Sequence, residues 1–510
     1  MLTEYVPSKM RVAKVREQVR AAIEARRPGA SRSRLWLCLA LAAIWCLCLF
    51  MAGQGTPGGW IGKCVTIGGS LITLLVCGQL LVKVMVPEDA AVRTYLPLML
   101  AMLLLSHVEI YLTDMAFSSL VLPRLGDAPE LARRVFAYPN AVTPLLVAML
   151  YGGPAALAIG IVTSAAFGAA ANFNMGAFLT ALCSTCIISR LAPRASGRRQ
   201  IAEVSAMAGG LQLIMVLVFL FRFADAGAKA SALILHTAFF FASLAFSTLA
   251  FLFIVLPLAE RITGRASNLS LGAYANLETP LLRRLSLEAP GTYHHAMMVG
   301  DLAQAAAEAI GANGMLARVG AYYHDIGKLG NPHFFMENQS GADNPHDKLP
   351  PNISRIILVN HVKEGSVLAR LYGLPRALRR FIATHHGTSV ARWFLVKEMK
   401  RRGKDGLADV DDATLESFFR YPGPLPVTRE ETIVSLADSV EAASRSMRFF
   451  DRAKIEGLVN DIVRDRWADG QLAKSELSNA DLEVVRRSFA ATLVPLLHGR
   501  LPYPPKNDPR

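Results

Sequence analysis

The sequence is short of charge, and its second half contains no cysteine. Only 18% of the 510 residues are charged and 52% are hydrophobic, whereas soluble proteins usually carry about a quarter charged residues. A cysteine in apolar surroundings behaves as a small hydrophobe, so we expect no disulfide framework. The absence of cysteine from the second half also argues against structural zinc of the zinc-finger type. All seven cysteines lie in the apolar first part of the chain: Cys38, Cys46, Cys48, Cys64, Cys77, Cys183 and Cys186.

The sequence also lacks a Walker loop and a glycine-rich dinucleotide fingerprint, so any nucleotide binding must rest on other groups. Acidic residues are outnumbered, 40 against 54 Lys and Arg, which gives a formal charge of +14. Such a charge could suggest nucleic acid. Much of the excess lies beside apolar segments, however, where it is typical of membrane topology. We therefore expect no DNA or RNA partner.

Long apolar runs are concentrated between Leu35 and Leu258. We interpret this part as a polytopic helical membrane domain in contact with lipid. The span at 139–153 is short, because such a helix reaches only about 22 Å against a hydrocarbon core of about 30 Å. If it dips in and out together with the next span, there are six crossings rather than eight. The predicted spans are residues 35–53, 62–86, 95–116, 139–153, 154–171, 175–190, 203–224 and 231–258.

Basic residues set the predicted orientation. Residues 1–34 contain nine Lys and Arg and three acidic residues. A second basic run follows the sixth span and contains Arg190, Arg194, Arg198 and Arg199. The positive-inside rule places both segments on the cytoplasmic side. An even number of crossings then places both termini there.

Two ionisable residues, His107 and Glu109, lie within the third predicted span. Such groups are costly if they face lipid, and they often mark functional sites. Two interpretations stay open here. The pair either serves a ligand or signalling role, or it snorkels or pairs with another helix.

The composition changes after Leu258, where charged residues return. We expect a linker over 259–284 and a second helical domain over 285–510. Its apolar residues follow helical spacing, as in Ile433, Leu436, Ala437 and Val440, and runs with strand periodicity are absent. The predicted fold class is therefore all-α, with a polytopic helical membrane domain followed by a cytoplasmic all-helical domain.

Eight of the eleven histidines lie between residues 294 and 386. Several stand beside residues suited to metal binding, including His324-Asp325 and the pair His385-His386. Imidazole with carboxylate suits iron, manganese or zinc, and a carboxylate can bridge two ions. A lone helical histidine is more often a packing residue. This number of histidines from separate helices, with a later helical aspartate at Asp438, instead predicts a metal site.

The motifs occur in a fixed order: GTYHH at 291–295, HDIGK at 324–328, NPHDK at 344–348, His361, HHG at 385–387 and LADSVE at 436–441. This set resembles the HD-domain phosphohydrolases, and more narrowly the membrane-anchored seven-transmembrane HD family. The resemblance implies a phosphodiesterase that hydrolyses cyclic di-AMP to pApA at the bacterial inner membrane. It also implies two divalent transition-metal ions, manganese or iron.

The resemblance assigns the ligands one by one. The first metal site is expected to contain His295, His324 and Asp438, and the second His361, His385 and His386. Asp325 would bridge both ions and serve catalysis. His294, next to a ligand, should point elsewhere on its helix.

Two further residues are candidates for substrate contacts. Lys328 follows Asp325 by one turn, and we expect it to neutralise a phosphate oxygen in catalysis; the alternative is a surface lysine near a helix end. His346 either lines the substrate pocket or belongs to a loop ordered by Asp347 and Lys348.

The sequence departs from its relatives in two respects. Only about eight residues separate the first two predicted spans, where related receptors place a large extracellular domain, so their input signal is not implied. The continuations His386-Gly387-Thr388 and Arg420-Tyr421-Pro422 differ from the HHE and GYP signatures of the cyclic di-GMP group. Cyclic di-GMP is therefore a weaker substrate candidate.

Other functions remain open at this point. Guanosine polyphosphates and mononucleotides share the same metal chemistry, and a non-catalytic nucleotide-binding receptor belongs to a different class. The size of the membrane domain suggests that it regulates the enzyme, with a lipid, a small ligand or a partner protein as input. A homodimer is an open alternative to a monomer.

Overall fold

The computed structural model describes the chain in several stretches. The predicted basic segment 1–34 and the span 35–53 lie outside them, and so does nearly all of the span 62–86. Every regular element of the described stretches is a helix, with one isolated bridge between Val390 and Arg420, which confirms the all-α fold class. The described stretches are residues 91–121, 141–170, 175–223, 230–339, 344–404, 412–445 and 451–498, with isolated positions at 75, 76, 79, 123 and 447.

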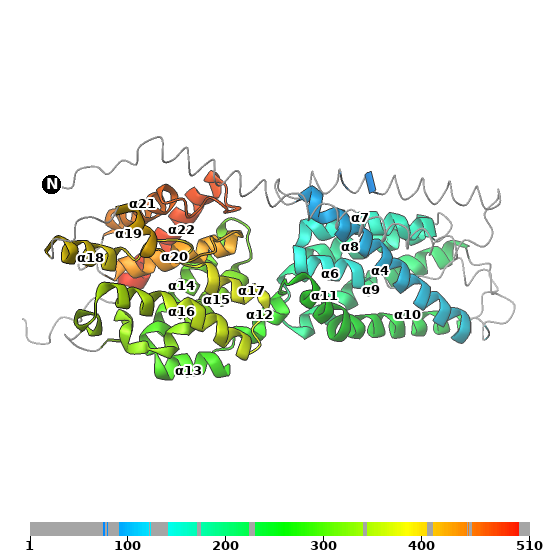
Figure 1. Ribbon diagram of the computed structural model, residues 1–510. Coiled ribbons are helices and arrows are strands. Elements are labelled where there is room, and N and C mark those ends of the chain that lie inside the picture. The colour runs from blue at the N-terminus through cyan, green and yellow to red at the C-terminus, as the bar shows by residue number, and fades with distance from the viewer. Residues whose placement is uncertain are drawn as a thin grey trace, which may run out of the picture. The chain divides into compact units, whose positions relative to one another are not determined.

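The chain divides into two compact units, with the boundary between Pro257 and Leu258 (Figure 1). In the first unit, α7 packs against α6 and α8, and α8 packs against α9. A π-helical turn at Phe251–Val255 joins α10 to α11. The helices are α4 (Ala91–Leu120), α6 (Val142–Tyr151), α7 (Gly153–Ala170), α8 (Met175–Leu191), α9 (Arg198–Phe223) and α10 (Ala230–Ala250), followed by α11 (Leu256–Thr263).

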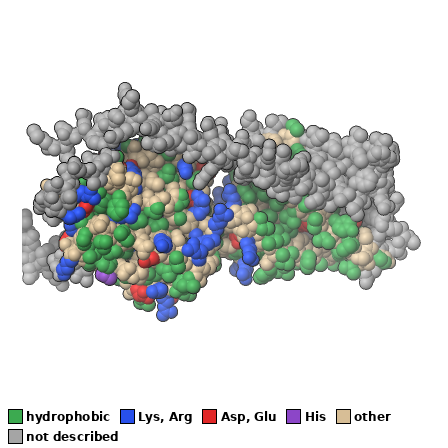
Figure 2. Space-filling model, in the orientation of Figure 1, with side chains coloured by type: hydrophobic (Ala, Val, Ile, Leu, Met, Phe, Trp, Pro, Cys, Tyr) green, Lys and Arg blue, Asp and Glu red, His purple; other side chains and the backbone are tan. Residues whose placement is uncertain are grey.

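These helices correspond to the six later predicted spans. Two stretches in the described part are long and apolar enough to cross a bilayer, Pro97–Leu120 and Thr237–Thr263. Helix α6 has 10 residues and is therefore about 15 Å long, which is too short to cross a core of about 30 Å alone. Most of its side chains are buried against protein. The visible described face of this unit is largely hydrophobic, whereas Lys and Arg gather on the other unit (Figure 2).

The two ionisable residues of the third predicted span lie on α4. His107 is buried, and its Nδ1 lies 2.9 Å from the Leu103 carbonyl oxygen. Both carboxylate oxygens of Glu109 are buried and have no hydrogen-bond partner among the described residues. The structure therefore places the polar groups of His107 and Glu109 inside this unit. Their ligand or signalling role stays a prediction.

The second unit is built around α14. This helix presents the small side chains of Ala303, Ala306 and Ala307 to its neighbours, so α15, α20 and α22 pack closely against it. The stripe predicted on α20 is buried in the same core. The helices are α12 (Asn268–Tyr274), α13 (Pro280–Glu288), α14 (Pro290–Ala309), α15 (Gly314–Tyr323), α16 (Pro351–Leu371), α17 (Arg376–Thr384), α18 (Arg392–Lys404), α19 (Asp412–Phe418), α20 (Arg429–Ser444), α21 (Arg452–Ala468) and α22 (Asn479–His498).

Four short 3-10 turns lie between α15 and α16. They are η4 (Ile326–Gly330), η5 (Pro332–Phe334), η6 (Met336–Asn338) and η7 (Pro345–Lys348). Turn η4 lies directly on α16, because Gly327 and Gly365 meet there without side chains. A second core contains Leu282, Leu285, Tyr323 and Ile326 and fixes α13 to this junction. The end of α15 is thereby held against α16.

Candidate metal centre

The predicted ligands come from five different helices and converge in the core of the second unit. His295 lies on α14, His361 on α16 and Asp438 on α20. His324 is the C-cap of α15, with Asp325 directly after it, and His385 and His386 follow the last residue of α17. Six of the seven side chains are buried, and His386 is half-buried.

Asp325 occupies the middle of the cluster and presents one oxygen to each half. Its Oδ2 lies 3.2 Å from His324 Nε2 and 3.5 Å from His295 Nε2. Its Oδ1 lies 3.3 Å from His361 Nε2 and 3.5 Å from His385 Nε2. The carboxylate therefore faces two separate groups of imidazole nitrogens, which is the arrangement expected of a bridging ligand.

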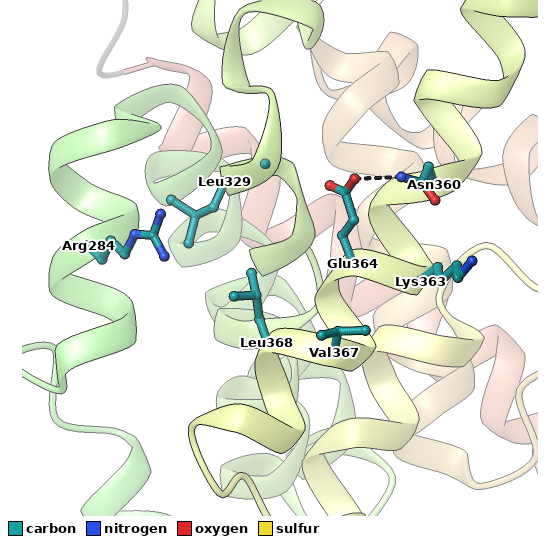
Figure 3. Close-up of a pocket in the computed structure, with 8 residues that line it drawn as sticks. Arg284, Leu329, Asn360, Lys363, Glu364, Val367 and Leu368 are labelled. Atoms are coloured by element: carbon teal, nitrogen blue, oxygen red, sulfur yellow. Dashed lines mark hydrogen bonds between the residues drawn. The ribbon is translucent and has the colours of Figure 1, made fainter.

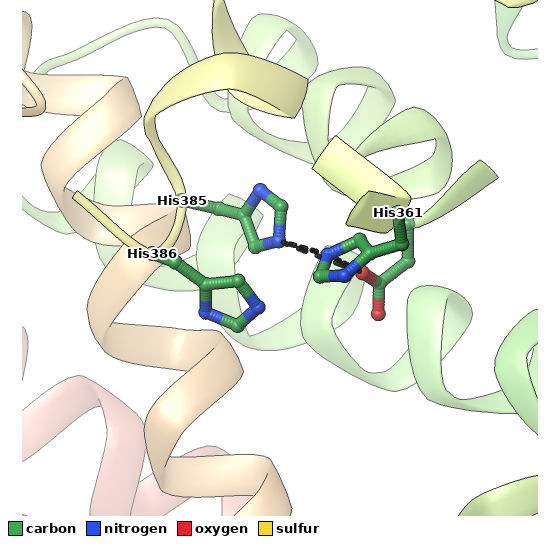
Figure 4. A group of neighbouring side chains, drawn as sticks. His361, His385 and His386 are labelled. Atoms are coloured by element: carbon green, nitrogen blue, oxygen red, sulfur yellow. Dashed lines mark hydrogen bonds and ion pairs between the residues drawn. The ribbon is translucent and has the colours of Figure 1, made fainter. Parts of the chain in front are cut away.

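Asp438 lies on the other side of the cluster. Its Oδ1 is 3.1 Å from His295 Nε2 and 3.8 Å from His324 Nε2. Its Oδ2 is 3.7 Å from His386 Nδ1. Figure 4 shows how His361, His385 and His386 turn their rings toward one another, and His361 Nε2 lies 3.2 Å from His385 Nε2.

Backbone and carboxylate groups fix the orientation of four imidazoles. The Nδ1 atom of His324 lies 2.6 Å from the Ala321 carbonyl, and that of His385 lies 3.0 Å from the Ile382 carbonyl. His361 uses Nδ1 in the same way toward Leu358, and His295 toward Glu441. Because a proton on Nδ1 leaves Nε2 as an acceptor, these contacts prepare Nε2 for a metal ion.

The charges of the site favour a cation at its centre. Burial opposes the charge of Asp325 and Asp438, but the surrounding histidines, together with Lys328 for Asp325, outweigh it and hold the pKa of both carboxyls well below the usual value. Burial likewise opposes protonation of His324, yet Asp325 raises its pKa to about 10. Positive charge at this point is thus strongly stabilised.

The adjacent pair His385 and His386 is suited to supply neutral ligands. Burial lowers the pKa of His385. Burial also lowers the pKa of His386, and the neighbouring His385 lowers it further. The buried atoms His324 Nε2 and Asp325 Oδ1 lie 3.2 and 3.3 Å from Asp325 Oδ2 and His361 Nε2, but neither makes a well-oriented hydrogen bond among the described residues. Since buried polar atoms are rarely left without a partner, this donor set of imidazole nitrogens and carboxylate oxygens fits transition-metal ions.

Lys328 lies beside the cluster and is nearly buried. Its Nζ donates to Asp325 Oδ2 at 2.7 Å and to Glu337 Oε1 at 2.6 Å. The same Glu337 oxygen accepts from Thr292 Oγ1, and Asn338 Oδ1 accepts from the Thr292 backbone N–H. A Cβ on Gly291 would lie 1.8 Å from the Glu337 carbonyl oxygen, so the start of α14 and turn η6 are in close contact.

Two other predicted residues lie apart from the cluster. His294 is exposed, as expected for the neighbour of a buried ligand position. His346 is buried, but its Nε2 contacts the Phe334 carbonyl at 2.9 Å and its ring packs on Phe334 and Phe394. These contacts support the loop-ordering interpretation of His346 over the pocket-lining one.

Three residues that contact the site were not predicted from sequence. Glu441 Oε2 lies 2.6 Å from His295 Nδ1, and its spacing of three from Asp438 was the available signal, because such residues share a helix face. The Tyr421 ring lies 4.2 Å from the His386 ring, centroid to centroid. Glu337 contacts Lys328 from a loop, where no spacing rule applies.

A pocket of about 370 Å³ lies between α13, η4 and α16. Figure 3 shows Arg284 on one side and Asn360 and Glu364 on the other, with Leu329 and Leu368 between them and Val367 below Glu364. Its lining residues flank Lys328 and His361 in the sequence, but none belongs to the histidine cluster. The chemistry of the site therefore rests on the cluster and not on this pocket.

The helical fold and the cluster around His324 and Asp325 define an HD-domain protein, a class whose fold is that of metal-dependent hydrolases. A family described as "HD domain" matches residues 292–443, and one described as "7TM receptor with intracellular HD hydrolase" matches residues 37–267. The chain belongs to this family of seven-transmembrane receptors with an intracellular HD domain, which confirms the resemblance found in the sequence and makes it a membrane protein.

Individual relatives agree with this assignment. The cyclic-di-AMP phosphodiesterase PgpH of Bacillus subtilis (strain 168) is 44% identical over 250 residues, which are 49% of this chain and 34% of the relative. An uncharacterised protein of Synechocystis sp. (strain ATCC 27184 / PCC 6803 / Kazusa) is 32% identical over 414 residues, 80% of this chain and 48% of the relative. The chain thus spans between a third and a half of the length of these curated relatives.

Among solved structures, the HD domain of L. monocytogenes phosphodiesterase PgpH in complex with cyclic-di-AMP is 40% identical. The match covers 44% of this chain and 100% of that chain, with a TM-score of 0.40.

Proposed function

We propose that the chain is a metal-dependent phosphodiesterase that hydrolyses cyclic di-AMP to pApA. The observation that carries the proposal is the placement of Asp325, whose two oxygens face two groups of histidines. The substrate is taken from the Bacillus relative, a cyclic-di-AMP phosphodiesterase. The departure from the GYP signature at Arg420-Tyr421-Pro422 supports the same choice.

The proposed first metal site contains His295, His324 and Asp438, and the second contains His361, His385 and His386, with Asp325 shared by both. Two potential ligand groups built on Asp325 support this division. Manganese or iron at these sites would polarise the phosphate and provide an activated water at neutral pH. The protein's own part is to hold the donor atoms in place through the Nδ1 contacts of the imidazoles.

Lys328 is the proposed catalytic cation. An ammonium group has three N–H donors, and Lys328 uses two of them on Asp325 and Glu337. The third can donate to a phosphate oxygen and offset the negative charge that builds on it during the reaction. Because the side chain is nearly buried, this interaction takes place where water screens it little.

The proposed organisation follows the sequence. Residues 1–34 form a cytoplasmic basic segment, residues 35–258 a membrane domain, residues 259–284 a linker that contains α12 and the start of α13, and residues 285–510 the HD domain. Both termini and the HD domain would lie in the cytoplasm, at the bacterial inner membrane. Reporter fusions at the N-terminus, near Arg198 and at the C-terminus test this topology, and an external signal from any of them contradicts it.

The membrane domain would act as a regulator, because one span suffices for an anchor. Its connection to the site runs through α11, α12 and α13 to the start of α14, which bears His295. Kinetics of the full-length protein in different lipids, with and without an insertion after Thr263, test this role. Identical kinetics in all cases would contradict it.

The activity is tested with the purified full-length protein, loaded with manganese or iron and given equal concentrations of cyclic di-AMP, cyclic di-GMP and a guanosine polyphosphate. Chromatography should show pApA as the main product. Faster turnover of another nucleotide would overturn the substrate but not the hydrolase. No turnover of any nucleotide by metal-loaded protein would overturn both and would favour a nucleotide-binding receptor.

A further inference from the structure

The exposed side of α18 combines large apolar side chains with basic ones. Trp393 is 72% exposed, and Val396 and Met399 are each 43% exposed. Their spacing of three residues places them along one side of the helix. A single exposed apolar residue is ordinary on a protein surface, but a helical row with a tryptophan marks an interaction site.

The charges of this helix are almost all positive. Its sequence RWFLVKEMKRRGK has six basic residues and one acid, Glu398. Glu398 is buried and bonded to Arg401 and Arg402, so it contributes little negative charge to the outer side. Arg392 and Lys400 are exposed beside the apolar row, and the outer side is therefore basic as well as apolar.

The inner side of α18 is firmly attached to its own domain. Phe394 packs in a small core with Ala391, Leu415 and Phe419. Lys397 Nζ, at the border, donates to the Asp347 carboxylate and the His346 carbonyl. The apolar row is consequently a stable surface of a folded helix.

We propose that α18 docks on an anionic lipid surface. A helix lies in the membrane interface when it presents apolar side chains, above all tryptophan, flanked by Lys and Arg. Each basic residue near an anionic leaflet is attracted to it. The chain also carries its own membrane domain, so a bilayer is present at a high effective concentration and weak docking suffices.

The position of α18 defines what docking would do. Within the second unit, α18 lies at the end opposite to α12 (Figure 1), whereas the chain enters this unit through α11. Docking would add a second attachment of the HD domain to the membrane, at the other end of this unit from α12. This inference uses the membrane domain and α18 only, so it stands independently of the proposed substrate.

The test uses full-length protein in nanodiscs and the fluorescence of Trp393. The protein has five tryptophans, so the signal of Trp393 is taken as the difference between the unchanged protein and a Trp393→Phe variant. In nanodiscs of phosphatidylcholine with phosphatidylglycerol, brominated lipids should quench this signal and its emission should shift to the blue. In pure phosphatidylcholine both effects should be much weaker.

A double charge reversal, Arg392→Glu with Lys400→Glu, should shift the balance from docked to undocked by on the order of tenfold or more. The matched control is Arg370→Glu with Lys474→Glu, which removes the same charge from exposed positions on other parts of the domain and should keep the quenching. Raising the salt to about 1 M shortens the Debye length to about 3 Å and should also weaken docking.

Three results would overturn the proposal. One is equal quenching of Trp393 in neutral and anionic nanodiscs. Another is equal loss of quenching in the test and control double variants, because net charge alone would then explain it. The third is a Trp393 signal that does not depend on the lipid composition but changes when a second copy of the protein or an acidic protein is added. The surface would then bind protein.

Discussion

Lys328 Nζ lies 2.6 Å from Glu337 Oε1, and both side chains are only 11% exposed. Burial opposes both charges, but Asp325 and Glu337 raise the pKa of Lys328, and Lys328 lowers the pKa of Glu337. Both groups are therefore charged at neutral pH. The lysine is held between the carboxylates of Asp325 and Glu337. Glu337 therefore helps to fix the direction in which the ammonium group points.

Replacing Glu337 with glutamine should reduce turnover. The variant keeps an acceptor of the same shape but loses the charge that orients Lys328, and a hydrogen bond to a charged group is worth about 1.5–3 kcal/mol. We expect kcat for cyclic di-AMP to fall by about tenfold or more, with a smaller change in KM and an unchanged metal content. Steady-state kinetics and elemental analysis of the same preparation measure all three.

The control is Glu456→Gln, which removes a carboxylate from an exposed pair with Arg452. Exposed pairs contribute little, so activity should stay unchanged. A full kcat in Glu337→Gln would show that Lys328 needs no second carboxylate.

Removing the carboxylate of Asp325 should reduce the metal content of the centre. In Asp325→Ala, both groups of histidines lose the carboxylate that they share, and we expect the bound metal to fall by at least one ion per chain and activity to disappear. Metal analysis gives a result that does not depend on the choice of substrate. His294→Ala, beside a proposed ligand but exposed, should keep both metal and activity, and a normal metal content in Asp325→Ala would refute the dinuclear assignment.

The helical fold could be predicted from local apolar spacing, and the residues of the cluster from the motifs of the family that the sequence resembles. The stripe Ile433, Leu436, Ala437 and Val440 marked α20, and all four are buried. The resemblance assigned Asp438 to the site, where it lies 3.1 Å from His295. Such features are visible in one segment at a time, or in a motif already known from a family.

Contacts between distant segments could not be predicted in this way. Glu337 and Thr292 are 45 residues apart, and no rule of spacing pairs a loop acid with a helix N-terminus. For His346, the neighbouring residues in the sequence left two roles open, lining of the substrate pocket or ordering of a loop. Its burial against Phe334 and Phe394, which the sequence does not reveal, favours one of them.

Glu441 should influence metal affinity although it is not a proposed ligand. It orients His295 through Nδ1, and losing such a partner typically costs about 10–100-fold in metal affinity. We therefore expect Glu441→Gln to lose metal to a chelator at a concentration lower by about tenfold, while saturating metal restores activity. Chelator titration followed by elemental analysis measures this shift. An unchanged titration would show that the His295 orientation does not depend on this carboxylate.

The last prediction concerns two glycines that differ only in their surroundings. A Cβ on Gly327 would lie 1.8 Å from the His361 carbonyl oxygen and 2.5 Å from the Gly365 nitrogen. Both are backbone atoms that cannot turn aside, so Gly327→Ala must push η4 away from α16 and separate Asp325 from His361. Overpacking of this kind usually costs about 1–3 kcal/mol.

Gly457, in contrast, lies on the exposed side of α21, and a Cβ there meets nothing within 4 Å. Gly457→Ala should raise stability by up to about 1 kcal/mol, because alanine favours a helix over glycine. Thermal unfolding of the full-length protein should therefore move in opposite directions for the two variants, and only Gly327→Ala should lose metal. Since each substitution adds the same methyl group, equal shifts would mean that η4 and α16 are not in the close contact on which the position of His361 depends.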